Sequence, residues 1–189
     1  AENLYKIGGK LLQISTDFVF DGKQSCPYCP EHKPSPINIY GESKLSAERK
    51  IIETFQGHNK YIILRTSWVI GPQGKNFLTT MLKLHSSKRN ISVVSDQIGC
   101  ITSTSSLANI CWLIIQRNLI DTSNNHRILH WTQAGVSSWF DVACEIGYFA
   151  EKLKIINKSA NVLPISSDEF LTRAKRPNFS LLDCSLTKK

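Results

Sequence analysis

The chain has 189 residues, of which 41% are hydrophobic, 20% charged and 9% aromatic. This composition is typical of a globular protein and excludes intrinsic disorder, collagen-like repeats and a coiled coil. Lysine and arginine together number 23, aspartate and glutamate 15, and the net charge is +8. A positive excess of this size favours an anionic partner, such as a nucleic acid, a membrane surface or a phosphorylated small molecule.

The single methionine, Met81, lies well inside the chain, which starts with AENLYKIGGK. This opening stretch has the pattern of the end of a helix, stopped by Gly8 and Gly9. We therefore expect the sequence to be part of a longer protein. No run of apolar residues approaches the ~20 that a membrane-spanning helix needs, so we expect no membrane partner.

Apolar runs alternate with helical patterns from one end of the chain to the other. In chain order, we predict a strand at 11–15, a helix at 40–55, a strand at 61–66, a helix at 77–87, a strand at 91–95, a helix at 105–117, a strand at 127–131, a helix at 137–153 and a strand at 162–165. A loop rich in proline precedes the first long helix, and Asn38 can cap that helix. Ser166, followed three residues later by Glu169, predicts a further helix start.

This alternation predicts an α/β fold built on a parallel sheet with helices on both faces. In such sheets, ligands bind beyond the carboxyl ends of the strands. The segments that directly follow predicted strands are therefore candidates for a binding site, and they are 15–17, 66–68, 96–97 and 132–133. Three of these four segments are rich in hydroxyl, amide or carboxyl groups.

The spacing of the six cysteines does not match a small disulfide-bonded domain. Cys111 and Cys144 fall in apolar helical stretches, where a free thiol behaves as a small hydrophobic group. We expect free thiols and a cytoplasmic protein. Cys26 and Cys29, followed by His32, have the spacing of half a zinc site, but no second pair completes the usual four ligands, so we predict no metal site.

Tyr40 and Lys44 are four residues apart in the first long predicted helix, which places them on one face. A cation beside a phenol stabilises the phenolate, so Tyr40 could donate a proton to a carbonyl oxygen while a hydride reaches the carbon. Thr16, at the end of a strand, could hold the same oxygen. Taken alone, the pair carries little weight, because this spacing commonly marks a half-buried tyrosine beside a solvated lysine.

Further motifs give the pair more weight. In order they are STDFVFDG at 15–22, YGESK at 40–44, RTSWVIG at 65–71, GKNF at 74–77, DQIG at 96–99, SW at 138–139 and RP at 176–177. This ordered set resembles the extended short-chain dehydrogenase/reductases, and within them the dTDP-4-dehydrorhamnose reductase family. The resemblance covers nearly the whole chain.

The resemblance implies a partial Rossmann-type parallel sheet with a smaller C-terminal substrate-binding lobe. It assigns 1–70 to the remainder of a dinucleotide-binding domain with the catalytic helix. It assigns 71–189 mainly to the lobe, with 104–132 returning to the Rossmann sheet. The implied reaction is reduction of the C4 keto group of dTDP-4-dehydro-L-rhamnose by NADPH or NADH. The glycine-rich turn that holds the cofactor phosphates in this family is not found in the sequence, so we expect the chain alone to be inactive.

The resemblance also implies roles for individual residues. Tyr40 matches the proton donor, Lys44 the lysine that binds the nicotinamide ribose, and Thr16 the hydroxyl of the catalytic triad. Ser15, Tyr40 and Lys44 would contact the cofactor. The residues implied in binding the nucleotide sugar are Asp17, Trp68, Asn76, Gln97 and Arg176.

Two of these assignments can be weighed by their chemistry. Arg176 suits a diphosphate because a guanidinium pairs with it bidentately, although a solvated arginine at a turn is the competing interpretation. For Trp68, the competing interpretation is a tryptophan that belongs to the hydrophobic core and does not contact a ligand. Phe18 follows Asp17 where related dehydratases carry a carboxylate, which favours reduction over dehydration.

Other functions stay open beside the reductase. Epimerases of the same superfamily are one alternative. Another is a regulatory protein like the beta subunit of methionine adenosyltransferase, which resembles the same reductase family. We expect no nucleic-acid partner, because the basic residues are spread along the chain and no known nucleic-acid-binding motif is present. A homodimer is the assembly that we consider.

Overall fold

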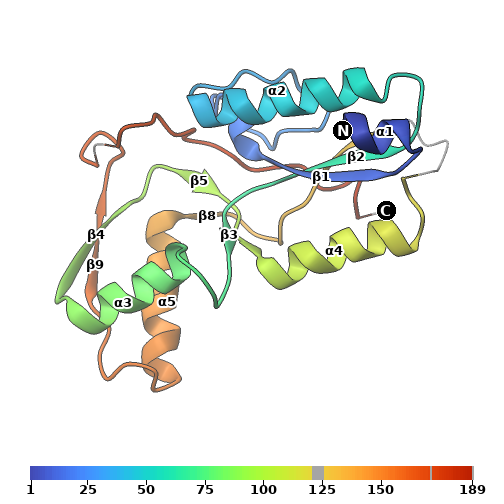
Figure 1. Cartoon of the computed structure of the whole chain (residues 1–189). Helices are drawn as coiled ribbons and strands as arrows, with labels where there is room; N and C mark the ends of the chain where they lie inside the picture. The colour runs from blue at the N-terminus through green and yellow to red at the C-terminus, as the bar shows by residue number, and fades with distance from the viewer. Residues whose placement is uncertain (121–125, 171, 189) are drawn as a thin grey trace.

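The computed structural model describes residues 1–120, 126–170 and 172–188. Its upper part holds a central sheet, and a smaller lobe lies below and to one side (Figure 1). The central sheet consists of β1 (Leu11–Thr16), β2 (Tyr61–Thr66) and β7 (Ile128–His130), in the order β1-β2-β7 and all parallel. The predicted α/β class with parallel strands is confirmed.

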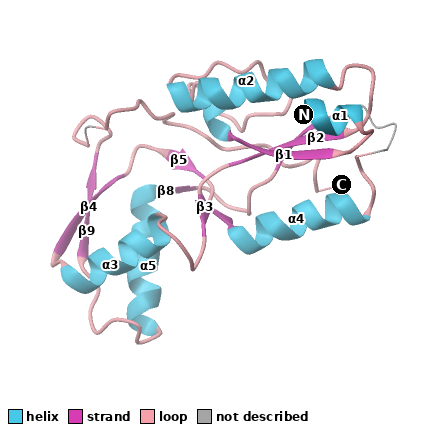
Figure 2. Cartoon of the chain, in the orientation of Figure 1, coloured by secondary structure: helices cyan, strands magenta, loops and turns pink. Residues whose placement is uncertain are grey.

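Helices cover both faces of this sheet. The short α1 (Glu2–Lys6) and the long α2 (Ile39–Thr54) lie on one face, and α4 (Thr104–Gln116) lies on the other (Figures 1 and 2). The strands of β1 and β2 are in register, so that Thr16 pairs with Thr66 at their carboxyl ends. Polar residues that follow the two strands are therefore brought to the same edge of the sheet.

Alternate side chains of β2 explain why both faces are covered. Ile62 and Leu64 pack in a core cluster with Ile110 and Ile114 of α4. The intervening Tyr61 and Ile63 belong to a second cluster, beneath α2. Every residue of this strand is buried. Full burial of one such aliphatic side chain contributes about 1.5–3 kcal/mol, so the first cluster holds α4 and the second holds α2 against opposite faces of the sheet.

The lower lobe has its own core between two helices and a two-stranded sheet. Its elements are α3 (Phe77–Ser87), β4 (Asn90–Val94), α5 (Trp139–Lys152) and β9 (Asn161–Ile165). Strands β4 and β9 pair in parallel. The buried centre of the lobe includes Met81, Ile91, Val93 and Ala143.

Very short elements connect the two parts. Parallel β3 (Val69–Ile70) and β6 (Thr102–Ser103) form one pair. Antiparallel β5 (Ile98–Gly99) and β8 (Ser137–Ser138) form the other. A 3-10 turn, η1 (Asp17–Val19), follows β1 directly. These elements are too short to produce a periodic pattern, and the sequence did not predict them.

Two predicted helix starts differ from the structure. The helix predicted at 137–153 begins only at Trp139, because Ser137 and Ser138 pair with β5. The helix predicted from Ser166 is wrong. The Glu169 carboxylate does accept hydrogen bonds from the Ser166 backbone and hydroxyl, but they close only a turn. Phe170 is half-exposed, so no apolar face holds a helix there.

Within the described part of the chain, no helix combines the length and the apolar character that crossing a membrane requires.

Candidate functional site

A cavity of about 500 Å³ lies beyond the carboxyl ends of β1 and β2. Its walls also include the start of α2, the segments after β2 and β4, the start of α5 and a C-terminal segment. Eight of the nine residues singled out in the sequence line this cavity, and they are Ser15, Thr16, Asp17, Tyr40, Lys44, Trp68, Gln97 and Arg176. The ninth, Asn76, is not among the lining residues.

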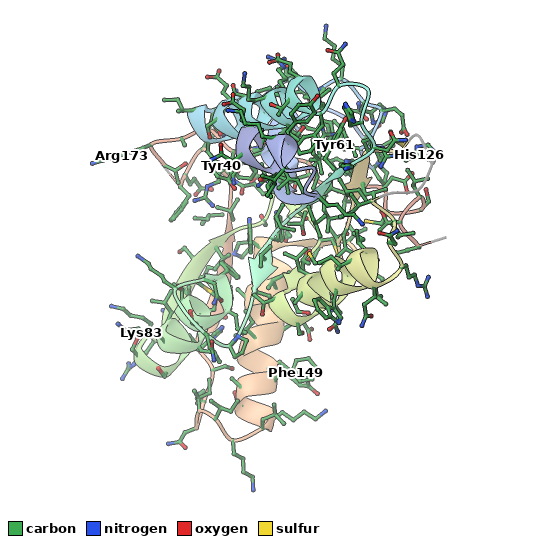
Figure 3. The ribbon with its side chains drawn as sticks, turned by 45° about the vertical axis from the view of Figure 1, so that its right-hand side comes forward. Tyr40, Tyr61, Lys83, His126, Phe149 and Arg173 are labelled. Carbon is green, nitrogen blue, oxygen red and sulfur yellow. The ribbon has the colours of Figure 1, made fainter. Side chains whose placement is uncertain are left out.

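The start of α2 carries Tyr40 into the cavity wall. Asn38 caps the helix by accepting a hydrogen bond from the Gly41 backbone at 2.8 Å. Tyr40 is 51% exposed, which leaves its ring accessible to a ligand. The Lys44 ammonium lies 5.8 Å from the centre of the Tyr40 ring, as expected for positions one helical turn apart. Figure 3 shows Tyr40 in the upper part of the molecule and Phe149 of α5 in the lower lobe.

Thr16 ends β1 with its hydroxyl already engaged. The hydroxyl donates to Asp17 Oδ1 at 3.0 Å and accepts a hydrogen bond from the Phe18 backbone at 3.2 Å. The second bond caps η1 and fixes the oxygen at the cavity wall. To donate to a ligand, the hydroxyl would have to turn away from Asp17, so the two residues act as a unit.

Asp17 is a carboxylic acid in an unfavourable place for a charge. It is 2% exposed, and its Oδ2 has no hydrogen-bond partner among the described residues. Burial raises the pKa of Asp17 to about 6, although the neighbouring hydroxyl groups of Ser180 and Thr16 act in the opposite direction. A buried, unpaired oxygen in a cavity wall can bind a ligand that supplies the missing hydrogen bond.

Ser15 lines the cavity, but its hydroxyl is already engaged with a buried partner. Its hydroxyl donates to Glu48 Oε1 at 2.5 Å, and Glu48 pairs bidentately with Arg65 at 3.0 and 2.7 Å. Glu48 and Arg65 are each 1% exposed. The Arg65 guanidinium also lies over the Phe20 ring, 5.1 Å from its centre. This buried network, which we call the Glu48 network (Ser15, Glu48 and Arg65), joins α2 to both neighbouring strands.

The prediction overlooked Glu48 and Arg65, although the sequence carries a signal for them. Arg65 lies inside the apolar run YIILRT, and a charge in a fully buried strand requires an opposite charge close by. The packing side of α2 contains Glu48 as its buried acidic residue. Glu48 and Arg65 belong to a predicted helix and the predicted strand that follows it, so their pairing could have been inferred from the sequence.

Trp68 is held at the junction of the two parts. Its backbone has φ of 46°, in the left-handed region that residues other than glycine rarely adopt. Its indole stacks on Trp139 of α5, with ring centres 3.7 Å apart and 10° between the planes. Gly99 leaves room for the ring, because a Cβ there would lie 2.5 Å from Trp68 Cε2. Trp139 also lines the cavity, although the sequence analysis did not predict it as a binding residue.

Three polar residues named for the nucleotide sugar lie in different settings. Gln97 is buried and donates to the Ser167 hydroxyl at 3.0 Å. Arg176 is exposed at the cavity rim. Asn76 caps α3 by accepting from the Thr79 backbone, and its amide nitrogen donates to the Gly71 carbonyl at 2.9 Å. Both ends of the Asn76 side chain are thus occupied in holding the loop before α3.

The cysteine loop does not assemble a metal site in the described residues. The Cys29 backbone donates to His32 Nδ1 at 2.8 Å, and the Cys29 thiol lies 3.5 Å from Asp183 Oδ2. No group of three or more His, Cys, Asp or Glu side chains in the described ranges is placed to hold a metal ion. All six cysteines are free thiols.

Comparison with known proteins places these features in a family. Residues 1–189 match the family model described as the RmlD substrate binding domain. The dTDP-4-dehydrorhamnose reductase of Sinorhizobium fredii is 37% identical over 185 residues, which cover 97% of this chain and 61% of that protein. The protein of the same name from Aggregatibacter actinomycetemcomitans is 36% identical over 188 residues, 100% of this chain and 62% of its own length.

Solved structures agree with the sequence relatives. The dTDP-4-dehydrorhamnose reductase of Bacillus anthracis, solved in complex with NADP, superposes with a TM-score of 0.84 at 39% identity, covering 99% of this chain and 61% of that one. The corresponding structure from Clostridium acetobutylicum has a TM-score of 0.85 at 34% identity, covering 98% and 60%. This chain therefore spans about three fifths of the length of these relatives. By its match along the whole sequence and by its fold, the chain belongs to the RmlD substrate binding domain family.

Proposed function

We propose that the protein containing this chain reduces the C4 keto group of dTDP-4-dehydro-L-rhamnose to give dTDP-L-rhamnose. The observation that carries the proposal is the meeting of Thr16, Tyr40 and Lys44 in one cavity wall beside Asp17, whose Oδ2 has no hydrogen-bond partner among the described residues. The relatives named as reductases of this sugar support the same activity. NADPH or NADH would supply the hydride, and the relative solved with NADP supports a cofactor of this kind.

The residues of the chain supply the proton and hold the developing charge. Tyr40 would donate its phenolic proton to the C4 oxygen as the carbon is reduced. The phenolate left behind is stabilised by the Lys44 ammonium, which lies 5.8 Å from the centre of the Tyr40 ring. Thr16 would turn its hydroxyl from Asp17 to the same oxygen. Asp17 Oδ2 would then accept a hydrogen bond from a sugar hydroxyl, which would satisfy its unpaired oxygen.

The fit to a nicotinamide cofactor rests on the same wall. Lys44 is only partly buried and faces the cavity beside Tyr40, where an ammonium can donate to ribose hydroxyl groups. Ser15 is a weaker part of the cofactor proposal, because its hydroxyl already donates to Glu48. In this proposal, Ser15 acts mainly through its backbone and through the Glu48 network.

The nucleotide sugar would occupy the rest of the cavity. Trp68 offers its indole and Gln97 a buried amide to the sugar, while Arg176 at the rim suits the diphosphate. Asn76 remains a proposed contact at the edge of the lobe. A ligand would have to replace one of its capping hydrogen bonds, so we expect any contribution from it to be small.

We also propose the wider setting of the site. Residues 1–70 would complete a dinucleotide-binding domain, and 71–189 would mainly form the substrate lobe, with 104–132 returning to the sheet. The parallel pairing of β7 with β2 supports this division. Six free thiols favour a reducing compartment such as the cytoplasm. A homodimer is the proposed assembly, and sedimentation of the full-length protein tests it.

Replacing Tyr40 tests the proposed reaction directly. In the full-length protein, Tyr40→Phe removes the proton donor but keeps the ring against Phe18. We expect cofactor oxidation that depends on the keto sugar to fall at least about 100-fold, with cofactor affinity retained. Tyr148→Phe, on the exposed side of α5, is the matched control and should retain full turnover.

The outcomes separate the competing functions. Full activity of the Tyr40→Phe variant would remove Tyr40 from the chemistry. If the unaltered protein turned over no keto sugar but purified in a stable complex with a methionine adenosyltransferase, the regulatory alternative would replace the reductase. Interconversion of two sugar epimers, without net oxidation of the cofactor, would point to an epimerase.

A further inference from the structure

Asn38 uses both ends of its side-chain amide, and only one of them serves the helix cap. Oδ1 accepts the hydrogen bond from the Gly41 backbone at 2.8 Å. Nδ2 donates to the backbone carbonyl of Lys175 at 2.9 Å, across 137 residues of sequence. The two partners fix the orientation of the amide, because a carbonyl oxygen needs a donor and a backbone N–H needs an acceptor. Capping alone would be served equally well by Ser or Asp.

The second bond reaches the segment that carries Arg176. Lys175 directly precedes Arg176, whose side chain makes no hydrogen bond or ion pair with the residues that the structure describes and lines the cavity rim. Pro177 is buried against Gly22, where a Cβ would lie 2.6 Å from Pro177 Cβ. The backbone on both sides of Arg176 is therefore held, while its guanidinium is available to a ligand.

The first turn of α2, which lies at the Asn38 end of the hydrogen bond, is also fixed by packing. A Cβ on Gly41 would lie 2.1 Å from the Phe18 carbonyl oxygen and 2.9 Å from Pro36 Cβ, so the first turn of α2 is packed tightly against these segments. The edge of the Phe18 ring also contacts the Tyr40 ring, with centres 5.7 Å apart. Because both segments are fixed, the hydrogen bond between Asn38 and the Lys175 carbonyl holds the start of α2 and the segment of Arg176 at a defined distance from each other.

We propose that Asn38 is a positioning residue that sets the placement of Arg176 relative to Tyr40. Through the Lys175 carbonyl, it holds the guanidinium where the diphosphate of a bound nucleotide sugar can pair with it while the keto group reaches Tyr40. This inference rests on the proposed function, since it takes Arg176 as the diphosphate contact. It assigns to Asn38 an effect on binding of the nucleotide part of the substrate, beyond its effect on helix stability.

Two substitutions separate the roles of the amide. Asn38→Asp keeps an oxygen for the Gly41 backbone but sets a carboxylate against the Lys175 carbonyl. Asn38→Ser keeps the cap without a charge and is too short to bridge. In the full-length protein, we expect both variants to raise the KM for the keto sugar about tenfold, with kcat within about twofold, since a lost hydrogen bond costs roughly one factor of ten. The KM for NADPH should stay the same, and the thermal midpoint should fall by only a few degrees, as expected for the loss of one hydrogen bond. Asn161→Asp, on the remote β9, controls for the change of residue type.

A double-mutant cycle with Arg176→Ala decides whether Asn38 acts through the guanidinium. If it does, Asn38→Ser should add nothing to the loss of affinity for dTDP that Arg176→Ala causes by itself. Additive losses, or an unchanged KM in both Asn38 variants, would overturn the inference. Binding of dTDP is measured by calorimetry and needs no turnover. The cycle therefore still applies if the unaltered protein fails to reduce the keto sugar, which would defeat the proposed function alone. Absence of dTDP binding to the unaltered protein would overturn the role of both residues.

Discussion

The buried carboxyl of Asp17 predicts a pH dependence of stability with a definite sign. Its pKa rises from 3.8 to about 6 on folding, because burial disfavours the carboxylate. Between these two values the folded protein keeps a proton that the unfolded chain has released. The free energy of unfolding therefore falls as the pH rises from about 4 to about 6 and stays lower above that range. A gap of about 2 pH units at ~1.4 kcal/mol per unit gives a cost of about 3 kcal/mol at pH 7.

Asp17→Asn tests this cost, because the amide has nearly the same shape and cannot ionise. It also keeps an oxygen that can accept the Thr16 hydroxyl. We expect the variant and the parent to have a constant difference in stability below pH 4. Between pH 4 and pH 7, the free energy of unfolding of the variant should rise by about 3 kcal/mol relative to that of the parent. Urea unfolding at half-unit steps between pH 4 and 8 measures the difference, and Asp168→Asn, an exposed aspartate, should show no such trend.

His130 contributes to the same curves but not to their difference. Burial lowers the pKa of His130 to about 3, so the unfolded chain takes up a proton first as the pH falls below 6.5, and stability decreases on the acid side. Both proteins contain this histidine, so its effect cancels. A difference between variant and parent that stays flat from pH 4 to 8 would refute the reasoning about Asp17. Weaker substrate binding together with the gain in stability would show that the carboxyl is retained for the ligand.

Two further substitutions test the supports of the cavity. Glu48→Gln leaves a buried guanidinium with a neutral partner, and we expect urea unfolding to show a loss of about 3–5 kcal/mol. Glu53→Gln, exposed on the same helix, should change stability by less than about 0.5 kcal/mol, and equal effects would contradict the importance of the buried pair. Gly99→Ala would place a Cβ 2.5 Å from the indole of Trp68. We expect a higher KM for the keto sugar with an unchanged KM for NADPH, and unaltered kinetics would show that Trp68 does not contribute to binding the substrate.

The main elements were predictable because their patterns are local. Strands such as 61–66 are continuous apolar runs, and capping residues such as Asn38 mark helix starts. The start of α5 was also visible, since Ser138 and Asp141 form a capping box, but the prediction extended the helix over Ser137 and Ser138. Their pairing with β5 depends on residues far away in the chain, and the local pattern holds no trace of it.

The sequence predicted which residues line the cavity better than it predicted the contacts that their side chains make. The rule that ligands bind at the carboxyl ends of parallel strands selected four segments. Segments 15–17 and 66–68 line the cavity throughout, 96–97 does so through Gln97 alone, and 132–133 does not line it. Ser15 and Asn76 were named by position, yet their polar atoms are bound to Glu48 and to the loop before α3. The direction of a side chain depends on neighbours from other elements. For the same reason, sequence reasoning did not identify the stack of Trp139 on Trp68.

The stack of Trp68 on Trp139 also provides a spectroscopic signal of the structure around the cavity. Two indoles that are nearly parallel and separated by 3.7 Å couple their electronic transitions, and such a pair gives a split band in circular dichroism. Trp68 follows the central sheet and Trp139 begins a helix of the lobe, so the splitting depends on how the two parts are aligned. A change in this alignment when a ligand enters the cavity would alter the spectrum without any added label.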